Sequence, residues 1–379
     1  MASRFPVQEM RSLLRSALPD VTATGASDSV EAKTLYVPER HARALSRDVA
    51  VVRGIRGSGK TLWWNALQDP QLRQRVVDRM DGLHFLTQAK VIKCFGAGGS
   101  DLYPSGRAVS QLLERGTEAE DIWRAIVLFG AAPESYPAEV ADWTSRVAWV
   151  QDRIEQTDQR LRQLDDDLDG SGRDLLMLFD GLDRAGRRWS DVRTMLRGLF
   201  QLLVDIRELK RIRGKAFIRP EMLDTPEITG FQDSSKLLND AVDLEWGATD
   251  LYGLLWQYLG NADDGEVFRR PCERFFSVQW EEVGDVWVVP DRLRRDPSLQ
   301  ERVLTAIAGK YMGSDHRRGK VYTWLPNHLG DARRQVSPRS FLVALRHAAE
   351  MSKSRTDAST AVDYHALKEG VVQASQVRR

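Results

Sequence analysis

A glycine-rich stretch of eight residues has the residue types and the spacing that bind phosphate. Residues 54–61 read GIRGSGKT and match GxxxxGK[ST] at every fixed position. Glycines let the backbone curl around a triphosphate, where converging N–H groups and the dipole of the following helix stabilise negative charge. Lys60 would reach the β- and γ-phosphates, and Thr61 would offer its hydroxyl to Mg²⁺. The stretch predicts a site for ATP and Mg²⁺ formed by Gly54, Arg56, Gly57, Ser58, Gly59, Lys60 and Thr61.

A second stretch is an apolar run that is followed by carboxylates. Residues 174–183 read DLLMLFDGLD, as expected of a central parallel strand whose carboxyl end meets a ligand. Asp180 would hold Mg²⁺ at the tip of this strand, and Gly181 would let the backbone pass close to the phosphates. Asp183 has two interpretations: it polarises the attacking water, or it caps a helix that begins near Arg184.

Two further regions contribute candidate ligand contacts. A strand over residues 215–218 would end at Arg219, which could reach the γ-phosphate or lie on the surface beside Pro220. Residues 35–41 lead into the first strand, and their side chains Tyr36 and His41 would either flank the nucleotide base or pack in the core.

The elements needed to position these residues alternate along the chain. Apolar runs predict strands over residues 48–53, 89–95, 174–180, 215–218 and 241–246. Helical spacing of apolar residues predicts helices over residues 61–77 and 191–209, the second with a basic end at residues 210–213. A helical excursion covers residues 101–173, and its charged helix over residues 137–168 either docks a partner or lies on its own domain. This alternation predicts an α/β protein.

Length and composition limit the organisation. A chain of 379 residues exceeds the usual size of a single core, so we expect an N-terminal arm over residues 1–34, a core over 35–246 and a mostly helical domain over 247–379. No apolar run approaches a membrane span, and the amino terminus lacks a secretory signal pattern. With two cysteines far apart in sequence, we expect a reduced, cytoplasmic protein.

Charge is nearly balanced overall but uneven along the chain. The net charge is +1, whereas residues 291–379 contain 17 Lys and Arg against 9 Asp and Glu. A solvated basic face and a DNA-binding surface both fit this excess.

With these motifs in place, the chain resembles the additional-strand P-loop ATPases, and among them the AAA+-related STAND and KAP-like ATPases. The resembling segments are GIRGSGKT at 54–61, LLMLFDGLDR at 175–184, AFIRPEML at 216–223, VDLEW at 242–246 and SPRSFLVAL at 337–345; the VPERHARAL lead-in at 37–45 resembles that of other bacterial ATPases. The resemblance implies a P-loop NTPase with a parallel five-stranded sheet ordered 5-1-4-3-2, a helical insertion and a helical C-terminal lid. It also implies that Arg219 is a sensor arginine and that Arg339 is a second sensor; an ion pair is the alternative for Arg339. Gly181 follows Asp180 where many AAA+ members have a catalytic Glu, so the identity of the base stays open.

Three functions follow as hypotheses. The first is an ATP-hydrolysing switch, or an oligomerising ATPase subunit, in a multi-protein bacterial system of stress or phage defence, with the output carried by protein partners. The second is a DNA-engaging ATPase of the origin-recognition type that uses the basic C-terminal region. The third is a kinase, for which the sequence has no separate acceptor-site motif.

Overall fold

The computed structural model describes residues 4–20, 30–96, 100–352 and 359–376, and these divide into two compact units. The first unit comprises Met1–Pro38, Ile55–Ser58 and Glu245–Arg379, and the second comprises Glu39–Gly54 and Gly59–Leu244. The boundary predicted after residue 246 lies two residues from the end of the second unit, whereas the N-terminal arm groups with the C-terminal helices.

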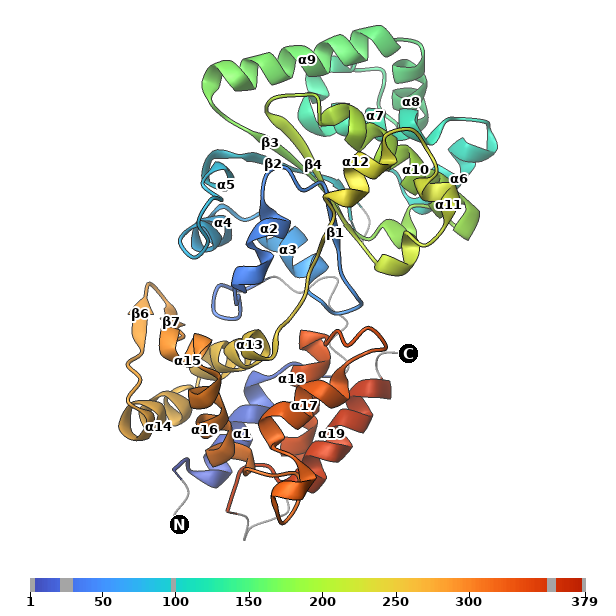
Figure 1. The fold of residues 1–379 in the computed structure, drawn as a ribbon. Helices are drawn as coiled ribbons and strands as arrows, with labels where there is room; N and C mark the ends of the chain where they lie inside the picture. Colours follow the sequence, from blue (N-terminus) through green and yellow to red (C-terminus); the bar gives the residue numbers. More distant parts are fainter. Residues whose placement is uncertain (1–3, 21–29, 97–99, 353–358, 377–379) are drawn as a thin grey trace. The chain divides into compact units, whose positions relative to one another are not determined.

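The second unit is built on a parallel five-stranded sheet in the order β2-β3-β4-β1-β5 (Figure 1). This order is the predicted 5-1-4-3-2 read from the other edge, so the predicted sheet is confirmed. Its strands are β1 (Val51–Arg53), β2 (Lys90–Phe95), β3 (Leu175–Phe179), β4 (Ile212–Ile218) and β5 (Val242–Asp243).

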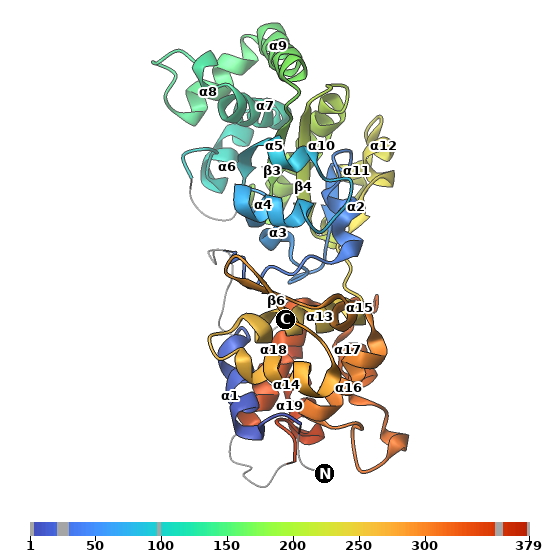
Figure 2. The same cartoon turned by 90° about the vertical axis from the view of Figure 1, so that its left-hand side faces the viewer.

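Helices cover both faces of this sheet. Leu175, Met177 and Phe179 of β3 join the core formed with α7 and α10, while Leu176 and Leu178 are buried on the opposite face because strand side chains alternate. Figure 2 shows the same unit after a quarter turn. Its helices are α2 (Ala42–Leu45), α3 (Lys60–Ala66), α4 (Pro70–Val77), α5 (Phe85–Gln88), α6 (Gly106–Glu114), α7 (Ala119–Ala131), α8 (Trp143–Gln151), α9 (Ile154–Ser171), α10 (Trp189–Ile206), α11 (Pro226–Thr229) and α12 (Ser234–Asn239).

The helical insertion packs closely on its own unit. Trp123 of α7 is fully buried and donates from Nε1 to the carbonyl of Met195 in α10 at 2.7 Å. A Cβ on Gly198 would stand 2.8 Å from the Cβ of Ala119, so this crossing of α7 and α10 requires a glycine. Leu161 and Leu168 of α9 are buried in the same core. The charged helix of the insertion therefore lies on its own domain, which was one of its two interpretations.

Three predicted elements were wrong in detail. The charged helix predicted over residues 137–168 is two helices, α8 and α9, with a turn at residues 152–153 between them. The helix predicted over residues 61–77 is two helices, because Asp69 accepts hydrogen bonds from the amides of Gln71 and Leu72 and Pro70 starts a new helix. The basic residues 210–213 do not end a helix, since α10 ends at Ile206 and β4 begins at Ile212.

The first unit is mostly helical. Its largest core includes apolar side chains of α1 and of the C-terminal helices, and Tyr252 and Tyr322 stack with ring centres 4.4 Å apart. Buried Arg11 of α1 donates from Nε to the carbonyl of Ala361 at 2.8 Å, which fixes the N-terminal helix to the C-terminal segment. Its elements are α1 (Val7–Ala17), α13 (Ala248–Asn261), α14 (Glu266–Phe276), the hairpin β6 (Glu281–Val283) and β7 (Val286–Val288), α15 (Asp291–Arg295), α16 (Pro297–Ala308), α17 (Val321–Leu329), α18 (Pro338–Met351) and α19 (Tyr364–Gln376).

In the part of the chain that the structure describes, no helix combines the length and the apolar character that crossing a bilayer requires.

Candidate functional site

The glycine-rich loop connects β1 to α3, as the sequence predicted. The amide of Gly54, directly after β1, donates to the carbonyl of Ile218 in β4 at 3.0 Å, which holds the start of the loop at the carboxyl edge of the sheet. Gly57 and Gly59 have φ angles of 79° and 103°, in the left-handed region that favours glycine. The loop thus has the backbone that a phosphate cradle needs, and α3 begins directly after it.

Lys60 is the first residue of α3, and its surroundings shift its pKa. Its Nζ donates to the carbonyl of Gly54 at 2.6 Å. Burial lowers the pKa of Lys60 to about 8, the carboxylate of Asp180 opposes this shift, and the charge of Arg219 adds to it. A polyphosphate beside this amine would favour its charged form.

The side-chain oxygens of Thr61 and Asp180 lie together. Thr61 Oγ1 donates to Asp180 Oδ2 at 2.7 Å, across 119 residues of sequence. Burial raises the pKa of Asp180, and the hydrogen bond from Thr61 opposes that rise. A hydroxyl and a carboxylate are hard oxygen donors of the kind that Mg²⁺ accepts, with phosphate oxygens and waters filling its other positions. Within the described residues no three His, Cys, Asp or Glu side chains cluster as a metal site.

Asp183 and Arg219 lie together at the same edge of the sheet. Arg219 Nη2 is 3.4 Å from Asp183 Oδ2, and both side chains are about one-third exposed. Asp183 lies inside a 3-10 turn (Leu182–Arg184). The cap position before this turn is occupied by Gly181, and the cap position before α10 is occupied by Arg188. The helix-cap interpretation of Asp183 therefore has no cap position to occupy, whereas its contact with Arg219 is present.

Sequence reasoning did not select Glu221 as a site residue. This exposed carboxylate follows β4 and is close enough to Lys60 to raise the pKa of the lysine. Its position two residues after Arg219, at the carboxyl end of a parallel strand, was the signal that could have identified it.

The two candidates for the base pocket are both buried. His41 is fully buried, and its Nδ1 accepts a hydrogen bond from Trp63 Nε1 of α3 at 3.0 Å. Tyr36 belongs to the first unit, where its hydroxyl packs so closely on Gly253 of α13 that a Cβ there would stand 2.4 Å away. The ring of Tyr36 lies 6.2 Å from that of Trp246. Packing accounts for both positions, and contact with a base stays a prediction.

Arg339 lies in the first unit, in the first turn of α18. Ser337 caps that helix by accepting from the amide of Ser340, and its Oγ donates to the carbonyl of Gly57 at 3.2 Å within the same unit. Trp246 Nε1 donates likewise to the carbonyl of Ser58 at 2.7 Å. Side chains that donate to loop carbonyls leave no motif in the sequence, so neither contact could be anticipated.

The strand order, the position of the glycine-rich loop after β1 and the helices on both faces define a P-loop NTPase-like α/β fold. Neither a protein-family model nor a curated protein matches the chain. Among solved structures, the chain is similar to the Aeropyrum pernix ORC2 protein, determined as ADPNP-ADP complexes, with 14% identity and a TM-score of 0.34 over 91% of this chain and 72% of that chain. A likeness at this level supports no statement about activity.

Proposed function

We propose that the protein binds ATP with Mg²⁺ at the carboxyl edge of the sheet and hydrolyses it as a molecular switch. The observation that carries the proposal is the hydrogen bond between Thr61 and Asp180. It brings the last residue of the phosphate loop to the carboxylate after β3, so that one metal ion could contact both side chains and the phosphates.

The cradle supplies the binding energy. The two glycines with positive φ would let the loop curve around the phosphates. The amides of the first turn of α3 would donate to phosphate oxygens, and the cation of Lys60 would contact the β- and γ-phosphates. A charged hydrogen bond contributes about 1.5 to 3 kcal/mol. Loss of Lys60 alone should therefore weaken ATP binding by at least about tenfold.

Hydrolysis needs a group that orients water. In this proposal Asp183 takes that role when ATP releases it from Arg219, and Arg219 turns to the γ-phosphate as the sensor. The ion pair between them supports this exchange, since a dianionic γ-phosphate competes with one carboxylate for the guanidinium. Glu221 is the alternative carboxylate.

The switch output would pass to a partner protein or to further copies of this chain. Arg339, in the first turn of α18 of the first unit, would sense the γ-phosphate. The association with stress or phage defence stays a prediction, because it rests on resemblance of fold alone.

The experiment is an equilibrium titration of a fluorescent ATP analogue with and without Mg²⁺. Lys60→Ala should lose binding, and Lys236→Ala, which removes an exposed lysine of α12 in the same unit, is the matched control. Equal affinities for Lys60→Ala and the unmodified protein would refute the proposal.

DNA engagement is the second candidate, favoured by exposed basic side chains at both ends of α17. Arg317 and Arg318 precede this helix, Arg333 and Arg334 follow it, and all four are exposed. Phosphate contacts release counterions, so duplex binding should weaken steeply with salt and lose slope when these four and Lys320 are replaced together. If the protein does not bind duplex DNA at low salt with ATP present, DNA engagement is excluded.

A further inference from the structure

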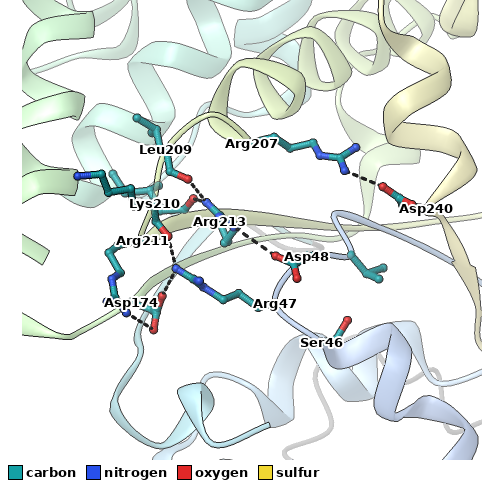
Figure 3. A network of polar contacts seen from close by, with 12 residues as sticks. Ser46, Arg47, Asp48, Asp174, Arg207, Leu209, Lys210, Arg211, Arg213 and Asp240 are labelled. Atoms are coloured by element: carbon teal, nitrogen blue, oxygen red, sulfur yellow. Dashed lines mark hydrogen bonds and ion pairs between the residues drawn. The ribbon is translucent and has the colours of Figure 1, made fainter. Parts of the chain in front are cut away.

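A pocket of about 170 Å³ lies at the amino ends of β1 and β4, the edge of the sheet that is opposite to the phosphate loop. Its walls combine basic, acidic and apolar side chains from the turn before β1, the end of α10 and the start of β4. The lining residues are Arg47, Asp48, Ala50, Leu203, Ile206, Arg207, Arg213 and Gly214. Figure 3 shows the polar contacts around it.

Arg47 contributes a cation with an unused donor. Its Nη2 lies 2.8 Å from Asp174 Oδ1, an ion pair without hydrogen-bond geometry, and also donates to the carbonyl of Lys210 (Figure 3). Its Nε is buried and has no hydrogen-bond partner among the described residues. A buried N–H without an acceptor costs about 1 to 3 kcal/mol, so an acceptor supplied from outside the chain would be stabilising there.

Arg213 is a second cation beside the pocket, and its ion pair with Asp48 is long. Its Nη1 donates to the carbonyls of Leu209 and Ile212, and its Nε is 4.0 Å from Asp48, whose side chain is 85% exposed. Burial lowers the pKa of Arg213, and the positive charge of Arg47 lowers it further. Two guanidinium groups that repel each other thus face one pocket.

The other charged groups around the pocket are already engaged. Arg207 pairs with Asp240 at 2.6 Å. Asp169 accepts from Arg211 at 2.8 Å. The carboxylate of Asp165 accepts hydrogen bonds from three backbone amides, at residues 210–212. Asp48, Asp165 and Asp174 favour the charged form of Arg213, against the effects of its burial and of Arg47.

We propose that this pocket binds a phosphate group of a small molecule. A phosphate offers several acceptor oxygens and a double charge, which match two guanidinium groups better than a single carboxylate does. The volume is below the range of about 300 to 1,000 Å³ that encloses drug-sized ligands, so the occupant is inorganic phosphate or the phosphate end of a small phosphomonoester. Leu203 and Ile206 give the pocket an apolar wall.

The test is a titration with inorganic phosphate and with ribose 5-phosphate at constant ionic strength, followed by calorimetry. It is done in the Lys60→Ala protein, so that the glycine-rich loop does not contribute, and the outcome does not depend on whether that loop binds ATP. Saturable binding that weakens by at least about tenfold in an added Arg213→Gln substitution is the expected result. Arg193→Gln is the matched control, because this arginine of α10 pairs with Glu227 and does not line the pocket.

A second variant keeps the charges and fills the space. Ala50 is buried and lines the pocket, so Ala50→Val should block phosphate while leaving both arginines in place. Tighter binding of ribose 5-phosphate than of phosphate would identify a phosphomonoester, and equal binding would identify free phosphate. No binding of either at low-millimolar concentration, or binding that survives both Arg213→Gln and Ala50→Val, would overturn the proposal and leave the arginines as ties between β1, β4 and α10.

Discussion

Lys215 lies in the middle of a central strand and is fully buried. Its Nζ donates to the carbonyls of Ala44, Ser46 and Val49 at 2.8, 3.1 and 2.5 Å, which fixes the segment between α2 and β1. Burial lowers the pKa of Lys215 to about 7. Lys215→Met keeps the aliphatic stem and removes the amine, so it isolates the contribution of the titrating group.

The magnitude follows from proton linkage. An unfolded lysine titrates near 10.5, so between pH 7 and pH 10.5 the unfolded chain binds more protons than the folded one, and stability rises with pH over that window. Each pH unit contributes up to about 1.4 kcal/mol. Because the folded lysine is half protonated at pH 7, the free energy of unfolding of the unmodified protein should gain about 2 kcal/mol relative to Lys215→Met between pH 7 and pH 9.

The assay is urea unfolding at pH 7, 8 and 9, followed by pulsed hydrogen exchange in peptides that contain β1 and β4. Lys236→Met, at an exposed position of the same unit, should track the unmodified protein at every pH. A difference between Lys215→Met and the unmodified protein that stays constant from pH 7 to pH 9 would refute the reasoning. It would mean that the three carbonyls keep the amine charged despite its burial.

The remaining predictions concern the nucleotide site. Asp180→Asn should lose Mg²⁺-dependent ATP hydrolysis while keeping nucleotide binding; turnover at the normal rate would locate the metal ligand elsewhere. Asp183→Asn should lower turnover by roughly 10² with ATP affinity nearly unchanged, and if Glu221→Gln shows that loss instead, Glu221 orients the water. Since burial lowers the pKa of Lys60 to about 8 and phosphates would raise it, ATP affinity should fall as pH rises above 8; a flat profile up to pH 10 would contradict this. Arg339→Ala should reduce affinity for ATP but not for ADP, and equal losses would make Arg339 structural.

Local pattern was sufficient for the sheet and the phosphate loop. The glycine-rich motif, the apolar run before Asp180 and the alternation of strands with helices each depend on neighbours in sequence, and the strand order came from the resemblance they supported. The contact between Thr61 and Asp180 could be anticipated because Thr61 follows β1, Asp180 follows β3, and the carboxyl ends of parallel strands lie at one edge of the sheet. Glu221 met the same criterion and was overlooked.

Contacts between buried polar groups were beyond the sequence. The residues 210–213 have the composition of a helix end, but Asp165 of α9 accepts from the amides of residues 210–212 and holds them in the turn before β4. Nothing near residue 210 indicates that acceptor, since it comes from 45 residues earlier. Tertiary hydrogen bonds therefore override the helix propensity of residues 210–213.

Lys215 offers a rule for reading such strands. Central parallel strands are almost continuously apolar, because a buried amine without acceptors costs several kcal/mol. A lysine within one therefore implies backbone carbonyls close by that no helix or sheet satisfies. Such carbonyls are present at Ala44, inside the single helical turn α2, and at Ser46 and Val49, in the segment that connects this turn to β1. The lysine that interrupts the apolar pattern of β4 thus identifies the irregular segment that its neighbour β1 must follow.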